Sequence, residues 1–128
     1  MMSAPYQAFE LAFEERDGYL YAKITSKAIT LERSEEYLSE VMRRCRELDC
    51  TRLMIERHIP QTLSNVEAYR LVTTLTDIIP EGLRVAMVDG NSNNRKRLEF
   101  GTRAARSQQV DAEIFSTVEK AEEWLTRA

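Results

Sequence analysis

The stretch FELAFEERDGYLYAKIT, residues 9–25, contains the pattern that decides the fold. Apolar and polar side chains alternate on both sides of Asp17-Gly18, as they do in strands that have one face in solvent. The pair Asp-Gly is typical of a two-residue type I′ turn, in which both central residues have positive φ. With this pair as the loop, Phe13 lies opposite Ala22 and the alternating apolar side chains share one face. The sequence therefore predicts an antiparallel N-terminal hairpin.

After the hairpin, helical periodicity alternates with short apolar runs. Apolar stripes at helical spacing predict amphipathic helices over 31–48, from 64 to 79, through 95–106 and through 118–125. The apolar runs predict buried strands at 53–55, 85–88 and 114–115. The order β-β-α-β-α-β-α-β-α predicts one α/β domain over residues 1–128, with a mixed, mostly parallel sheet.

Two local signals mark where helices begin. Ser64-x-x-Glu67 and Ser116-x-x-Glu119 both match the capping box, in which the first side chain bonds the amide three residues on. They predict the starts of the second and fourth helices. Gly101 lies in the middle of the third predicted helix, where glycine costs about 1 kcal/mol relative to alanine.

Composition excludes several classes of protein. A chain of 128 residues fits one domain, and its net charge of -3 gives no overall attraction for nucleic acid or anionic lipid. No apolar stretch is long enough to span a membrane, and no targeting pattern opens the sequence, so we expect a cytoplasmic protein. Cys45 and Cys50 lack the spacing of a redox pair or a zinc site. We expect Cys45 to pack in the core, and we expect no metal and no cofactor.

Two further stretches carry a family resemblance. RVAMVDG at 84–90 is similar to the fourth strand and exit turn of SpoIIAA-like, STAS-type domains, and EIFSTVEKAEEWL at 113–125 is similar to their closing strand and last helix. The chain resembles this group over nearly its whole length. The resemblance implies a βα superhelix in which an antiparallel first strand joins successive βα units. We expect Trp124 and Leu125 to be buried against Phe115 and Val118.

The phosphorylation site of the better-known members has no counterpart in this chain. The resemblance implies a regulator with an Asp-Ser turn after the third strand, where the serine is phosphorylated. The corresponding stretch, IPQTLSNVEAYRL at 59–71, has no Asp-Ser pair and no following glycine. We interpret Ser64 as a helix cap and not as a phosphorylation switch.

Polar residues follow the third and fourth predicted strands. Glu56-Arg57-His58 closes the third strand and residues 89–94 follow the fourth, so the two groups are expected to be neighbours at the carboxyl ends. Strand alternation places Glu56 and His58 on one side and Arg57 on the other. We interpret Glu56 and His58 as a structural pair. No nucleophile elbow, phosphate loop or metal motif accompanies them, so the sequence predicts no enzyme.

The third predicted helix is strongly basic. Residues 95–106 hold five cationic side chains and one anionic, a local charge of +4, whereas residues 107–128 carry -3. This balance favours a solvated face with surface ion pairs. The alternative is a small-anion site in which Asn91, Ser92, Asn93 and Asn94 cap the helix and Arg95 and Arg97 hold the anion. No aromatic side chains are interleaved as in a nucleic-acid site.

Two functions follow from these patterns. The first is a non-enzymatic regulatory module that acts by contact with another protein or with a second copy as a homodimer. The alternative is a carrier of a small anionic or lipid-like ligand at the carboxyl ends of the parallel strands, as in relatives with a SEC14-type pocket. A carrier needs an apolar cavity, whereas a contact module needs an exposed patch. The candidate site residues are Glu56, Arg57, His58, Ser64, Asn65, Asp89, Asn91, Asn93, Asn94, Arg95 and Arg97.

Overall fold

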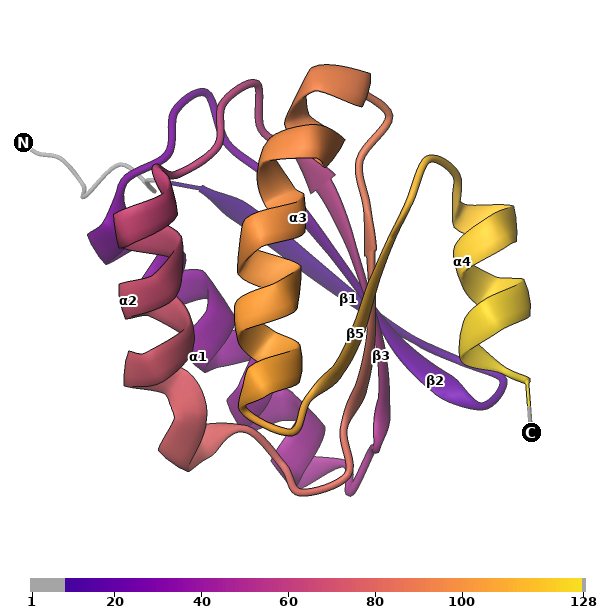
Figure 1. Ribbon diagram of the computed structural model, residues 1–128. Helices are drawn as coiled ribbons and strands as arrows, with labels where there is room; N and C mark the ends of the chain where they lie inside the picture. The colour runs from indigo at the N-terminus through magenta and orange to yellow at the C-terminus, as the bar shows by residue number, and fades with distance from the viewer. Residues whose placement is uncertain (1–8, 128) are drawn as a thin grey trace, which may run out of the picture.

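The computed structural model describes residues 9–127, in which five strands form a sheet in sequence order (Figure 1). β1 and β2 are antiparallel and the other neighbouring pairs are parallel, which confirms the predicted mixed sheet. The elements are β1 (Glu10–Arg16), β2 (Tyr19–Thr25), α1 (Leu31–Glu47), β3 (Arg52–His58), α2 (Asn65–Leu75), the 3₁₀ turn η1 (Thr76–Ile78), β4 (Arg84–Val88), α3 (Ser92–Ser107), β5 (Asp111–Phe115) and α4 (Val118–Leu125).

The hairpin has the predicted register but a different turn. Phe13 pairs with Ala22, as the alternation requires. Gly18 has φ of 87°, whereas Asp17 is not among the residues with positive φ, so the turn is not type I′. Positive φ costs an aspartate free energy that it does not cost a glycine, and the loop uses positive φ at the glycine alone.

Helices cover both faces of the sheet. α1, α2 and α3 lie on one face and α4 lies on the other (Figure 1). Alternate side chains of β2 point to opposite faces of the sheet. Leu20 and Ile24 pack on the side of the first three helices, whereas Tyr19 and Tyr21 pack with α4. The central strands β2, β3 and β4 therefore have two buried faces, as a parallel sheet covered on both sides requires.

Helix boundaries differ from the prediction in α2, α3 and α4. α3 begins at Ser92, three residues before the predicted stretch 95–106. The box at Ser64 and Glu67 is confirmed, but α2 ends at Leu75 and continues as η1, so the second helix is shorter than predicted. The cap of α4 is Thr117 and not Ser116: the Thr117 hydroxyl accepts from the Lys120 amide, and the Thr117 backbone is extended. A hydroxyl can cap only from the position whose backbone is still extended, and that position is one residue later than the motif suggested.

α4 docks as expected, with one correction. Leu125 is fully buried in the α4-side core with Ala121, whereas Trp124 is only half-buried. The indole ring lies against Phe115, with ring centroids 5.5 Å apart, and the Arg84 guanidinium lies 4.2 Å from the indole centroid. The outer side of the ring is therefore next to a cation near solvent and not inside the core.

Candidate functional site

The carboxyl ends of β3 and β4 border an open cleft of about 460 Å³, which we call the carboxyl-end cleft. β3 and β4 are neighbours in the sheet, as their predicted order implied. The loop that leads from β5 into α4 also lines the cleft, at Ser116 and Thr117. The structure brings six of the sequence-predicted site residues together here, namely Glu56, Arg57, His58, Asp89, Asn91 and Asn94.

Glu56 and His58 form a pair on the α4 side of the sheet. His58 Nε2 lies 2.8 Å from Glu56 Oε2, and the Tyr21 hydroxyl donates to Glu56 Oε1. Partial burial tends to raise the pKa of Glu56, but the hydrogen bonds from Tyr21 and His58 outweigh it and lower that pKa. A carboxylate held in its charged form by two partners suits a structural pair better than a general base.

Arg57 lies on the opposite face and belongs to a buried polar network. Its Nη1 donates to Asp89 Oδ2 over 2.6 Å, and its Nη2 donates to the Gln61 carbonyl over 2.7 Å. Asn94 Nδ2 donates to Asp89 Oδ2 and to the Ile59 carbonyl, each over 3.2 Å. Arg57, Asp89 and Asn94 are all buried, so the network ties the ends of β3 and β4 to α3.

The two arginines of the predicted anion site do not converge. Arg95 donates from Nη1 to the Asp89 carbonyl over 2.8 Å and lies in a cleft on the outer side of α3, whereas Arg97 is exposed and borders a different hollow. Asn91 caps α3 by accepting from the Asn94 amide. Asn93 is exposed on the first turn of α3.

Ion pairs occupy the outer face of α3. Arg106 lies 2.9 Å from Glu113, and Arg103 lies 4.0 Å from Glu99. The first pair joins α3 to the acidic C-terminal segment, the second lies within α3, and both are exposed, where ion pairs contribute little stability. Of the remaining candidates, Ser64 caps α2 and Asn65 is its exposed first residue, so the structure places neither of them in the carboxyl-end cleft.

The carboxyl-end cleft therefore has a polar lining whose groups already bond one another. Glu56 is held by Tyr21 and His58, and Asp89 by Arg57, Asn94 and the Asn91 amide. Within residues 9–127, no group of three or more His, Cys, Asp or Glu side chains is placed to hold a metal ion. The cleft is large enough for a small ligand, but few of its polar groups are free to bind one.

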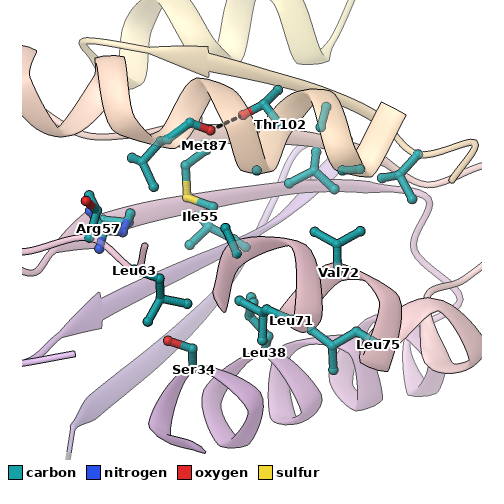
Figure 2. A pocket seen from close by; sticks show the side chains of 18 of the residues that line it. Ser34, Leu38, Ile55, Arg57, Leu63, Leu71, Val72, Leu75, Met87 and Thr102 are labelled. Carbon is teal, nitrogen blue, oxygen red and sulfur yellow. Dashed lines mark hydrogen bonds between the residues drawn. The ribbon is translucent and has the colours of Figure 1, made fainter. Parts of the chain in front are cut away.

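A second hollow, the helix-side cavity, lies between α1, α2, α3 and the sheet, with a volume of about 160 Å³ (Figure 2). Small residues stand where α2 and α3 face each other, since a Cβ added to Gly101 would lie 3.6 Å from the Ala68 Cβ. The lining is mainly apolar and includes Leu38, Ile55, Leu71, Val72, Met87 and Leu98.

Polar groups collect at one end of this cavity. Arg57, Ser34 and Thr62 line it together with the buried Tyr37. Burial raises the pKa of the Tyr37 hydroxyl, and the nearby Arg57 guanidinium opposes that shift. One feature of the sequence indicates this polar end of the cavity. Ser34 interrupts the apolar stripe of α1, three residues after Leu31 and four before Leu38. Nothing in the pattern around Thr62 indicates its position.

Comparison with known proteins places the fold. No family model matches the chain, and no curated protein matches it. A solved structure that is similar is that of an uncharacterised protein of the DUF3478 family with a SpoIIAA-like fold from Shewanella loihica PV-4. The two chains are 17% identical with a TM-score of 0.54, and the match covers 98% of this chain and 99% of the other.

Two conclusions rest on these observations. None of the helices within residues 9–127 has the length and apolar composition that crossing a bilayer requires. The strand order, the mixed sheet, the α4 docking and the structural match over nearly the whole chain agree with the expected architecture. The chain is an α/β domain with a SpoIIAA-like fold.

Proposed function

We propose that the protein is a non-enzymatic module that binds a small, mostly apolar molecule in the helix-side cavity. The observation that carries this proposal is the cavity itself, about 160 Å³ of space with apolar walls and a polar end. Well-packed cores leave few voids larger than a water molecule, and an apolar cavity of about 150 Å³ is large enough to bind benzene. A core that keeps such a space loses packing energy unless a ligand restores it.

The position of the cavity also supports a binding role. The sequence pattern predicts a ligand at the carboxyl ends of the strands, whereas this cavity runs along the face of the sheet and reaches those ends only near Arg57. α2 covers it, and Leu75 is the one buried residue of that helix. A helix with so little buried surface opens at lower free energy than the rest of the core, which gives a ligand a route of entry.

A second candidate function is contact with another protein or a second copy. Val66 and Tyr69 are the large hydrophobic side chains exposed within residues 9–127, at 67% and 51%, and they share one face of α2. Two exposed side chains form a small patch, and scattered surface apolar residues are normal. The cavity therefore carries the stronger argument.

Native mass spectrometry of protein purified from its own host tests the proposal. We expect wild type to retain a small mass that denaturation releases. Val72→Phe places a ring in the cavity and should abolish that retention, because Val72 lines the cavity from α2. Thr74→Phe is the matched control, since Thr74 is exposed on the same helix and does not line the cavity.

Two outcomes count against ligand binding in the cavity. One is wild-type protein without a retained mass, and the other is Val72→Phe that retains the mass as well as Thr74→Phe does. A dimer without any small mass, converted to monomer by Val66→Lys with Tyr69→Lys, supports the contact function instead.

A further inference from the structure

We infer that the helix-side cavity selects a neutral molecule with one hydrogen-bonding group, such as an alcohol, a phenol or an amide, on a compact apolar body. This inference rests on the proposed function and specifies the chemistry of its ligand. Three observations carry it: two buried hydroxyls without partners, a cation that is already neutralised, and the volume of the cavity.

The unpartnered hydroxyls belong to Ser34 and Thr62. Within residues 9–127, Ser34 Oγ and Thr62 Oγ1 are the buried side-chain polar atoms without a hydrogen-bond partner, and both residues line the cavity. Ser34 is only 1% exposed. A buried hydroxyl that makes no hydrogen bond costs free energy, and most such groups in native proteins are satisfied. A ligand that bonds them recovers that free energy.

The two hydroxyls lie at the same end of the cavity. Thr62 follows Gln61, whose carbonyl accepts from Arg57 and whose side chain accepts from the Ile29 amide over 3.3 Å. Ile29 leads directly into α1, and Ser34 lies in the first turn of that helix. Figure 2 shows Ser34 and Arg57 toward one side of the cavity, with Leu75 toward the other. A ligand would therefore place its polar group at the Arg57 end.

The charge balance at this end favours a neutral group over an anion. Arg57 is paired with Asp89 at 2.6 Å, and both side chains are almost completely buried. A ligand carboxylate buried beside Arg57 would therefore meet a cation that Asp89 already neutralises, whereas Arg97, the other arginine of the lining, is exposed and keeps its charge near solvent. Burying that carboxylate costs more than a hydrogen bond returns. A hydroxyl or amide group instead meets two hydroxyls that both donate and accept.

The volume limits the size of the apolar body. A cavity of about 160 Å³ is close to the engineered cavity of about 150 Å³ that binds benzene. A single ring or a short branched chain of roughly six to nine non-hydrogen atoms fits this space, and a longer acyl chain would extend beyond it.

Titration with three matched probes tests the inference. Toluene, benzyl alcohol and benzoate share a ring and differ in having no polar group, a neutral one and an anionic one. We would measure their dissociation constants by calorimetry or chemical-shift titration for wild type, Ser34→Ala and Thr62→Val. Thr102→Val is the control, because Thr102 lines the same cavity but its hydroxyl already donates to the Leu98 carbonyl over 2.9 Å.

We expect wild type to bind benzyl alcohol and to bind benzoate at least tenfold more weakly. The ratio of the toluene to the benzyl alcohol dissociation constant should fall by about three- to tenfold in Ser34→Ala, in Thr62→Val or in both, and not in Thr102→Val. Comparing ratios between variants removes the difference in hydration of the two probes. Thermal unfolding of each variant verifies that it is folded.

Other results separate the two proposals. If toluene binds but neither hydroxyl changes the ratio, or if benzoate binds best, the inference about a neutral polar group is overturned and the proposed function stands. If none of the three probes binds wild type, both the inference and binding in this cavity are overturned.

Discussion

At the scale of single residues, the buried pair of Arg57 and Asp89 joins the ends of β3 and β4. Their side chains are 3% and 5% exposed and lie 2.6 Å apart. Such a pair adds little stability relative to apolar residues, but removal of one partner leaves the other buried without compensation. The pair therefore makes the carboxyl ends of the two strands sensitive to substitution.

The effects of substituting Arg57 and Asp89 on stability should be strongly coupled. Arg57→Met should lower the free energy of unfolding by about 3–5 kcal/mol, because the Asp89 carboxylate then has no cation. Arg57→Met combined with Asp89→Asn should lose less than the sum of the two single changes, since no unpaired charge remains. Urea denaturation of the four proteins measures the cycle. Additive losses would mean that the two charges do not depend on each other.

Cys45 gives a second residue-scale prediction. Burial, with a smaller contribution from Cys50, raises the pKa of the Cys45 thiol from 9.0 to about 12. The stabilisation from keeping this thiol neutral is complete below pH 9, where the unfolded thiol is also neutral, and is lost as pH rises toward 12. In Cys50→Ser, a thiol reagent at pH 8 should label Cys45 only as fast as the protein unfolds. Labelling at the rate seen in urea would show that Cys45 is accessible.

At the scale of elements, α2 and α3 approach each other through small residues. Gly101 is in the middle of α3, and a Cβ at that position would lie at ordinary contact distance, 3.6 Å, from the Ala68 Cβ. The helix therefore has room for alanine, although its sequence has glycine.

Gly101→Ala should raise the free energy of unfolding by about 0.5–1 kcal/mol, because alanine is the better helix former and meets no clash. Gly82→Ala is the control: Gly82 has open space around it but φ of 76°, so alanine should lower stability by about 1 kcal/mol. Denaturant unfolding compares the two. A loss in Gly101→Ala would mean that the helices must approach more closely than a methyl group allows.

The same elements show what a sequence pattern can predict. The hairpin register followed from alternation, and the start of α2 followed from the reciprocal bonds of Ser64 and Glu67, because both signals are local. The α4 cap depended on which of two adjacent hydroxyl residues keeps an extended backbone, which the motif does not encode. The cavity depends on how side chains of separate helices fail to fill a space, so it has no local signature.

In the candidate site, too, features set by local sequence patterns were predicted and features set by tertiary packing were not. Strand order placed Glu56 and Asp89 at neighbouring ends, and alternation placed Arg57 opposite Glu56, as the structure has them. The charges of Arg95 and Arg97 suggested an anion site, but their positions on the helix send them to different hollows. Which side chains contact each other depends on the tertiary structure, and the sequence pattern does not show it.

At the scale of the whole molecule, the two faces of the sheet differ. α4 closes one face over Met54 and Ala86, which are fully buried together with Leu125 of α4, whereas the three helices on the other face surround a cavity of about 160 Å³. The polar cleft at the carboxyl ends bonds mainly to itself. We therefore propose that a ligand binds under α2 and not in the cleft.

The most direct test is a map of backbone amide chemical shifts during titration with toluene. Ligand binding under α2 predicts saturable shifts at the lining of the helix-side cavity, around Ile55, Leu71 and Leu98, and their loss in Val72→Phe. Amides on the α4 side, such as that of Ala121, should not shift. Absence of saturable shifts, or shifts confined to the carboxyl-end cleft around His58 and Gly90, would contradict the assignment of ligand binding to this cavity.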